Sequence, residues 1–354
     1  MRNAALSLVL LSLTVPSFAS AQEEEETAFI IDSETLKEEK KDSLDWRLIS
    51  GATFTLQDNQ GVVGQQDGTA VGFGFKLDTG IDWRTGDHEW RNSLGVQAGL
   101  TRNPAVDRFV KSQDVLDVDS IYLYHINDWF GAFGRFAYNT TMFRGTDVRA
   151  EPTNYRVYAQ GEDVGDPNQG TPRRGLLTLN LTDPFLPSRF RESLGLFAQP
   201  YKREVLNIET RLGGGARQTL ADGQLAISDD EERTPDQVDV ATLSDVIQVG
   251  TELAVELWGS FQEKKITYRL AADAMTPFYN NQAAGSDKSA LELTNFNARA
   301  SLSVKIVEWA SLDYEFATIY EPQLVDKVQL RNNLLLTFGF ATGSPDKEEE
   351  AAAE

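Results

Sequence analysis

The chain has 354 residues, a net charge of −21 and no cysteine. Such an acidic balance excludes nucleic acid as a partner, because the phosphates would be repelled, and the lack of cysteine excludes a disulfide framework. After the N-terminal segment, no apolar run approaches the roughly 20 residues that a spanning helix needs, which excludes a helical membrane protein.

The first 21 residues are predicted to be a secretory signal peptide. Arg2 precedes an apolar run from Ala5 to Thr14, and the small residues Ala19-Ser20-Ala21 follow. A basic start, a short apolar core and an Ala-x-Ala end are typical of a signal cleaved after its last alanine. The apolar core is too short to anchor the chain in a bilayer. We therefore expect the mature chain to be exported.

Charged segments flank the mature chain. Residues 22–44 begin with four consecutive glutamates after Gln22, and residues 341–354 are acidic in balance, with five acids and one lysine. Both segments are predicted to be disordered, the first as a periplasmic linker and the second as a tail, because they carry little apolar surface to bury. Residues 45–340 have a different pattern and are predicted to form one domain.

Side chains in this domain alternate with a period of two. Along residues 71–83, nearly every second side chain is apolar or aromatic, and those between are glycine, lysine or aspartate. A β-strand points successive side chains to opposite faces, whereas a helix would mix the two sets. The same alternation predicts strands at residues 46–56, 69–84, 89–102, 115–127, 129–143, 191–202, 206–219, 246–261, 265–278, 290–307, 309–320 and 328–340.

These segments predict an all-β fold, a transmembrane antiparallel up-and-down β-barrel of about 12 strands. Most are long enough to match the roughly 9–11 residues with which a tilted strand crosses a bilayer. Short periplasmic turns and longer external loops are typical of outer-membrane barrels, which surround themselves with lipid and lipopolysaccharide. Here very short links alternate with longer ones, at residues 57–68, 103–114, 144–190, 220–245, 279–289 and 321–327.

A soluble sandwich or lipocalin-like barrel is the alternative, because strands alternate there too. A soluble barrel would keep its charged face outside and its aromatic face inside, and a membrane barrel reverses them. We favour the membrane arrangement, with an interfacial aromatic girdle of Trp83, Trp90, Trp129, Trp258 and Trp309. The candidate lumen-lining residues are Lys76, Asp78, Arg91, Arg135, Arg211, Glu252, Arg269, Arg299, Lys305, Asp313 and Arg331.

Two resemblances support this location. Residues 333–340 resemble the C-terminal strand signal that hands outer-membrane barrels to the barrel assembly machinery, although fourteen residues follow Phe340 here. Residues 46–340 also resemble an uncharacterised family of gram-negative outer-membrane barrels, known only as a domain of unknown function. That resemblance implies fold and location, and no activity. It rests on Trp90-Arg91-Asn92-Ser93-Leu94, the Asp117 to Phe143 hairpin, and Leu186-Pro187-Ser188 before Leu194-Gly195-Leu196.

We expect no enzyme, cofactor or metal site. The two histidines, His88 and His125, lie near predicted periplasmic turns, whereas most barrel enzymes work near the external rim. The sequence contains no nucleophile elbow, zinc-type histidine cluster or phosphate loop. An envelope hydrolase is therefore the weakest of three functional hypotheses.

The two stronger hypotheses concern the interior and the loops. The charges on the predicted lumen face nearly balance, which fits a narrow pore for small hydrophilic solutes or a closed structural or adhesive barrel laced with ion pairs. Residues 144–190 form either an inward-folding constriction or a mobile external cap. Residues 221–244 include Asp229-Asp230-Glu231-Glu232, which we interpret as a solvated acidic loop rather than a divalent cation site.

Overall fold

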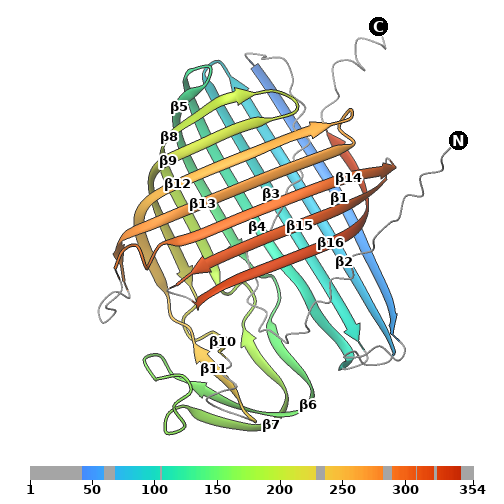
Figure 1. Ribbon diagram of the computed structural model, residues 1–354, viewed down its shortest axis with the longest axis vertical. Helices are drawn as coiled ribbons and strands as arrows, with labels where there is room; N and C mark the ends of the chain where they lie inside the picture. Colours follow the sequence, from blue (N-terminus) through green and yellow to red (C-terminus); the bar gives the residue numbers. More distant parts are fainter. Residues whose placement is uncertain are drawn as a thin grey trace, which may run out of the picture.

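In the computed structural model, twelve antiparallel strands close into a barrel in the order β1-β16-β15-β14-β13-β12-β9-β8-β5-β4-β3-β2. The predicted fold class is therefore confirmed. Figure 1 shows the strands tilted against the barrel axis, as closure requires. The structure describes residues 42–59, 68–103, 106–228, 236–281, 289–307, 309–322 and 325–343. The predicted signal peptide, most of the linker at 22–44 and residues 344–354 of the tail lie outside these ranges.

Each of the twelve predicted strands has a counterpart in the barrel, most with bounds within a few residues. The barrel strands are β1 (Asp42–Asn59), β2 (Gly68–Thr85), β3 (His88–Asn103), β4 (Val106–Asn127), β5 (Phe130–Thr140), β8 (Ser188–Lys202), β9 (Asn207–Leu220), β12 (Val246–Phe261), β13 (Ile266–Asn280), β14 (Asn295–Val307), β15 (Ala310–Glu321) and β16 (Val325–Gly343).

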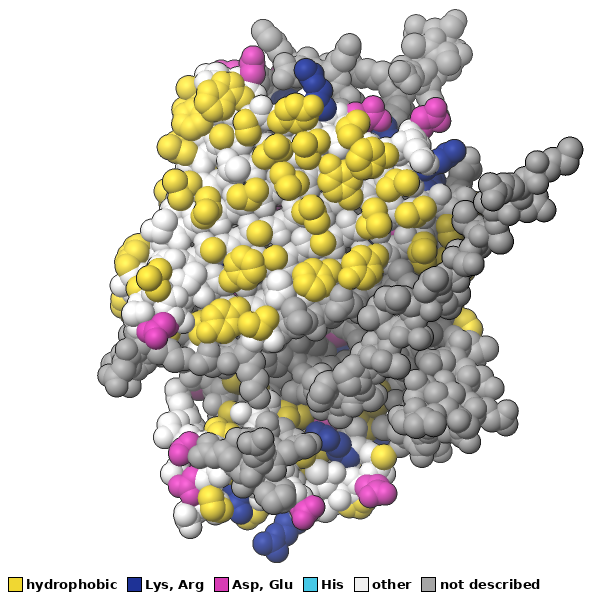
Figure 2. All heavy atoms as spheres, in the orientation of Figure 1, with side chains coloured by type: hydrophobic (Ala, Val, Ile, Leu, Met, Phe, Trp, Pro, Cys, Tyr) yellow, Lys and Arg dark blue, Asp and Glu magenta, His cyan; other side chains and the backbone are white. Residues whose placement is uncertain are grey.

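The outer wall of the barrel is apolar. Side chains such as Phe73, Leu194 and Leu253 are half or more exposed, and Figure 2 shows hydrophobic side chains spread over the wall with few charges among them. Near the short-turn end, the exposed aromatic residues include Trp83, Trp90, Trp129, Trp309, Tyr122 and Tyr124. An apolar band with aromatic side chains at its border suits the hydrocarbon core and the interface of a bilayer.

The strict alternation of short and long links is wrong at two places. The longer links expected at 103–114 and 321–327 are mostly strand, because β3 ends at Asn103 and β4 begins at Val106, and β15 ends at Glu321 and β16 begins at Val325. Residues 106–114 pair with the end of β3 through two register shifts. Such irregularities obscure a period of two, which is why the sequence pattern ended early.

The two longest links fold together into a second sheet. We call this unit the loop sheet; it has the order β10-β11-β6-β7, with β11 parallel to β6. It lies beyond the end of the barrel in Figure 1. The expectation that residues 144–190 fold inward as a constriction is therefore wrong, whereas the alternative of an external cap agrees with this position (Figure 1), and the mobility of that cap stays a prediction. Asp229 to Glu232 lie outside the described residues. The strands are β6 (Gly145–Tyr158), β7 (Thr171–Thr182), β10 (Leu225–Ile227) and β11 (Val238–Thr242).

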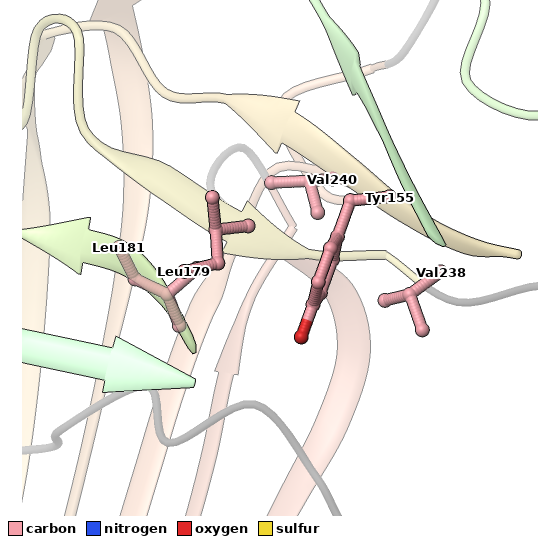
Figure 3. Packing of buried hydrophobic residues seen from close by; sticks show 5 residues of the cluster. All are labelled: Tyr155, Leu179, Leu181, Val238 and Val240. Atoms are coloured by element: carbon pink, nitrogen blue, oxygen red, sulfur yellow. The ribbon is translucent and has the colours of Figure 1, made fainter. Parts of the chain in front are cut away.

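The loop sheet has its own apolar core. Tyr155 of β6, Leu179 and Leu181 of β7, and Val238 and Val240 of β11 form one buried cluster. Figure 3 shows these five side chains gathered between the strands. This burial stabilises the sheet in the ordinary way of a water-soluble fold, by removing apolar surface from water.

Two carboxylates, the buried Asp114 and the half-buried Asp245, fix the links between the barrel and the loop sheet. The Asp114 carboxylate of β4 accepts hydrogen bonds from the backbone N–H groups of Met142 (2.9 Å) and Phe143 (2.8 Å). The Asp245 carboxylate accepts one from the backbone N–H of Ala221 at 2.8 Å. Bonds of this kind from a carboxylate to backbone are charge-assisted and therefore strong. They hold the points where the chain leaves the barrel and where it returns.

The barrel closes where β1 meets β16. This seam has six consecutive residue pairs, from Arg47 opposite Gly343 to Ala52 opposite Phe338. On its other side β1 pairs with β2 along eighteen residues, from Asp42 to Asn59. The seam is thus the shorter of the two pairings that β1 makes.

Candidate functional site: the charged barrel interior

The candidate lumen residues on β2 reach across to β15. The Lys76 ammonium lies 3.5 Å from the Asp78 carboxylate on its own strand. It also donates a hydrogen bond of 3.3 Å to Glu315 on β15. Asp78 is 1 % exposed, so this cluster is enclosed by the wall. Candidate Asp313 lies nearby on the same face of β15 and accepts hydrogen bonds from Ser303 and Ser311.

A second group of charges crosses the interior nearer the short turns. We call it the periplasmic ion-pair layer; it comprises Glu89, Arg91, Glu209, Arg211 and Glu256. Arg91 of β3 donates to Glu209 of β9 at 3.0 Å, between strands four positions apart in the ring of twelve. Glu209 also lies 3.2 Å from Arg211, and Arg211 lies 3.6 Å from Glu256. Candidate Arg269 pairs with Glu256 as well.

A third group crosses the interior nearer the loop sheet. This external ion-pair layer comprises Arg191, Arg217, Asp273 and Glu321. Arg191 lies 3.8 Å from Asp273 of β13 and 3.7 Å from Glu321 of β15, and β15 is five positions from β8 in the ring. Arg217 donates to Asp273 at 2.6 Å and lies 4.0 Å from candidate Glu252. Ion pairs therefore span the lumen at two depths.

A cavity of about 180 Å³ lies in the barrel interior. Its walls include Arg91 and Arg211 of the periplasmic layer and Arg191 and Asp273 of the external layer. Candidate Arg135, which donates to Asp119 at 2.9 Å, lines it between these layers. Candidates Arg269 and Arg299 also line it. Both groups of crossing ion pairs thus border the cavity.

Two candidate lumen residues are placed differently from the others. Lys305 shares its strand face with Ser301 and Ser303, which are buried, but it is exposed close to the short turn that ends β14. Arg331 belongs to β16 and pairs in register with Ala317 of β15. The side chain of Arg331 lies outside the described part of the structure.

The predicted position of Trp258 is wrong. It was expected in the interfacial girdle, but it lines the interior cavity. It has the same parity on β12 as the buried Glu252 and Glu256, whereas Leu253 and Val255 face outward. Its indole Nε1 is buried, with no hydrogen-bond acceptor among the described residues.

The two histidines lie on opposite sides of the wall. His88 faces outward, where its ring lies 5.3 Å from that of Tyr124. His125 faces inward, where its Nε2 lies 2.8 Å from Glu89 and its ring meets Phe197 edge-on. Phe197 packs in an interior apolar cluster with Ile121, Leu123 and Phe133. A Cβ on Gly131 would lie 2.0 Å from the backbone oxygen of Tyr124 and 2.6 Å from the Phe197 ring, so the close approach of β4 and the packing of Phe197 both favour glycine at position 131.

Sequence reasoning missed several interior residues. Glu89 and Arg191 each make two or more ion pairs, and the pair of Arg191 with Glu321 joins strands five positions apart, the widest separation among the ion pairs of the described residues. The parity of the strands contained the signal for Arg191, which shares a face with Ser193 and Phe197, both buried. Parity cannot reveal the partner, because strands that are far apart in the ring meet only once the barrel is closed.

Within the described residues, no group of three or more acidic or histidine side chains is placed to hold a metal ion. No helix in that part of the chain is long and apolar enough to cross a membrane.

Two tyrosines of the loop sheet, Tyr155 and Tyr158, have raised pKa values. Burial raises the pKa of Tyr155 to about 12, and the hydrogen bond of 2.8 Å that its hydroxyl donates to Asp147 contributes in the same direction. Burial also raises the pKa of Tyr158, and the nearby Asp239 carboxylate adds to the effect. In each case the ionised phenolate would lose water and face a carboxylate, so the neutral form is favoured.

A closed antiparallel barrel with an apolar outer wall and a charged interior defines a transmembrane β-barrel of the outer-membrane type. The chain matches a family described as "Protein of unknown function (DUF3078)" over residues 64–145, which include β2 to β5. This match confirms the resemblance to a family without an established activity. No curated protein matches the chain.

Several solved outer-membrane barrels are similar to the chain at low identity. The translocator domain of the autotransporter NalP from Neisseria meningitidis is 12% identical, with 86% of this chain and 87% of that chain covered and a TM-score of 0.35. An outer membrane channel from Pseudomonas putida is 10% identical, with 86% and 97% covered and a TM-score of 0.35. With TM-scores this low, the assignment rests on the strands and side chains of this chain.

Proposed function

We propose that the protein is a narrow outer-membrane channel for small hydrophilic solutes. The observation that carries this proposal is the polar cavity that both ion-pair layers border inside the barrel. Replacing buried ion pairs by apolar side chains of similar volume is often stabilising, because charges lose hydration when they are buried. A charged interior therefore does little for stability alone. A path for hydrophilic solutes, in contrast, needs polar and hydrated walls.

The external layer is the proposed restriction of this path. The contacts of Arg191 with Asp273 and Glu321 are 3.7–3.8 Å long. Charge-assisted hydrogen bonds of arginine to carboxylate are usually about 2.7–2.9 Å. The longer contacts are weaker and separate more readily, so small solutes pass when Arg191 swings away from the opposite wall. The channel is then one of low conductance.

Single-channel recording of the refolded full chain in planar bilayers tests the proposal. We expect a small, steady conductance, increased in the double variant Arg191→Gln/Glu321→Gln, because both charges of the crossing pair are removed together. The control is Arg144→Gln/Asp183→Asn, a pair of the external loops that is more than half exposed on both sides. Silence of both the full chain and the Arg191→Gln/Glu321→Gln variant would contradict a channel.

A closed barrel that acts through its loop sheet is the second candidate. The apolar core of that sheet supports it, because residues of two separate links bury their side chains together. The test replaces residues 145–182 and 222–244 by short glycine-serine turns; both must go, because β11 pairs with β6. If the barrel still folds and stays silent with and without the sheet, this second candidate is favoured over the channel.

A further inference from the structure

Arginine is the most frequent charged residue in the lining of the interior cavity, and we infer that the cavity binds a small oxyanion, a carboxylate or a phosphate. If the oxyanion is the solute that the channel carries, the inference rests on the proposed function. As a binding site, it can be measured without any conductance.

The charge around the cavity carries the first step. Seven arginines and five carboxylates line it, which gives the wall an excess of two positive charges in a chain of net charge −21. Three further carboxylates pair with lining arginines from outside the lining: Glu89 and Glu209 pair with Arg91, Glu209 also pairs with Arg211, and Glu321 pairs with Arg191. The excess of two therefore applies to the cavity wall itself. The arginines are Arg47, Arg91, Arg135, Arg191, Arg211, Arg269 and Arg299, and the acids are Asp82, Asp117, Asp119, Glu256 and Asp273.

The chemistry of the lining carries the second step. Guanidinium is a planar fork of N–H donors that matches carboxylate and phosphate oxygens and cannot be deprotonated in a protein. The arginines come from strands all around the ring, from β1 to β14, so their head groups converge on one space. An anion in that space would meet donors from several sides, whereas a cation would meet more positive than negative side chains.

Trp258 supplies a separate observation. Its buried Nε1 has no acceptor among the described residues, and an indole N–H can only donate. A buried donor of this kind normally has a partner, such as water or an ion. Trp258 pairs in register with Arg269, and the Glu256 two residues before it binds both Arg211 and Arg269. The indole donor therefore shares a part of the cavity wall with Arg269 and with Glu256, the carboxylate that binds both guanidinium groups.

The volume limits the ligand. A space of about 180 Å³ holds a few water molecules together with an anion of several heavy atoms. Inorganic phosphate and succinate are therefore suitable probes, one for each oxyanion class, and glucose is the matched uncharged probe.

Isothermal titration calorimetry on the refolded full chain tests the site. We expect phosphate or succinate to bind and glucose not to bind, and the stronger of the two anions identifies the class. Trp258→Phe should weaken binding roughly tenfold, because one hydrogen bond to a charged ligand is lost. Glu256→Gln should strengthen binding, because it removes a competing negative charge while keeping an acceptor for the arginines. Trp309→Phe, on the outer wall, should leave binding unchanged.

The outcomes separate this inference from the proposed channel. A misfolded variant cannot bind more tightly, so stronger binding by Glu256→Gln supports the site even if Trp258→Phe folds poorly. No binding of either anion, or affinities unchanged in both variants, overturns the inference. Anion binding without current in planar bilayers overturns the channel and leaves the site. Current without anion preference in a salt gradient, together with no binding, leaves the channel and overturns the site.

Discussion

The barrel and the loop sheet distribute the same residue types in opposite ways. On the barrel, Leu194 is 72% exposed while Glu209 is buried. In the loop sheet, Tyr155 and Val240 are fully buried while Arg173 is exposed. Lipid surrounds the barrel wall and water surrounds the loop sheet, so burial of apolar surface is favourable only in the second. Alternation alone therefore does not show whether a strand faces lipid or water. The surrounding medium is shown by whether the exposed side chains of the strand are the apolar or the polar ones.

The largest expected effect concerns the core of the loop sheet. Leu179→Ala removes a side chain that is 3 % exposed and should cost the sheet about 2–5 kcal/mol of local stability, through lost burial and a cavity. Hydrogen exchange of the β6 and β11 amides should accelerate, while that of the barrel amides stays slow. Leu177→Ala on the same strand, whose side chain is 41% exposed, is the control. Equal effects of the two variants would mean that the cluster is not a core.

Replacing an exposed leucine of the barrel wall by a charged residue tests whether that wall faces lipid. Leu194→Arg places a charge near the middle of β8 on the outer face, where lipid cannot solvate it. We expect a loss of about 2–4 kcal/mol in the free energy of unfolding in lipid vesicles. Leu177→Arg adds the same charge to the loop sheet and should have little effect. A harmless Leu194→Arg would contradict a lipid-facing wall.

The junction between the two regions should be less sensitive. Asp114→Asn keeps the shape of the side chain but weakens its bonds to the N–H groups of Met142 and Phe143 and to Lys111. We expect a loss of about 1–3 kcal/mol, seen as faster exchange of these two amides. The comparison is Asp183→Asn, whose carboxylate is 63% exposed and should contribute little. Equal protection in both variants would contradict an anchoring role for Asp114.

The smallest effect appears only in alkaline solution. The pKa of Tyr155 is raised to about 12 in the folded loop sheet, whereas an unfolded tyrosine titrates near 10. Below pH 10 both forms are neutral; between 10 and 12 only the unfolded form ionises, so stability falls as pH rises. Tyr155→Phe should make the stability of the loop sheet, measured by limited proteolysis, fall less steeply over this range. An unchanged slope would rule out Tyr155 as its source.

The barrel strands were predictable because a membrane strand is long and has two chemically opposite faces. From Val71 to Trp83 the pattern runs uninterrupted across the bilayer, so its period is clear. The strands of the loop sheet are shorter or irregular. Leu179-Asn180-Leu181 and Val238-Asp239-Val240 do alternate, but each core strand contributes only a few residues and the pairing joins distant links. The sequence pattern did not reveal the lengths of the loop-sheet strands or which of these strands pair with one another.

The sequence predicts which side chains face the barrel interior, but it does not predict which of them form ion pairs with one another. Parity placed Arg91 and Arg135 on the charged face, but the pairing of Arg191 with Glu321 depends on the closure of the ring. Trp258 was assigned by its distance from a turn, although its parity with Glu256 pointed inward. At that position the general preference of tryptophan for interfaces was a poorer guide than the period of the strand.

The short seam has a consequence for the order in which this molecule forms. Most neighbouring barrel strands are joined by local hairpins, which fold soon after both halves emerge, whereas β1 must wait for β16 at the other end of the chain. Until then the sheet has two open edges whose backbone groups have no partners, a condition that lipid does not tolerate. Six residue pairs between β1 and β16 complete the ring. The barrel therefore closes only after β16, the last strand, has paired with β1.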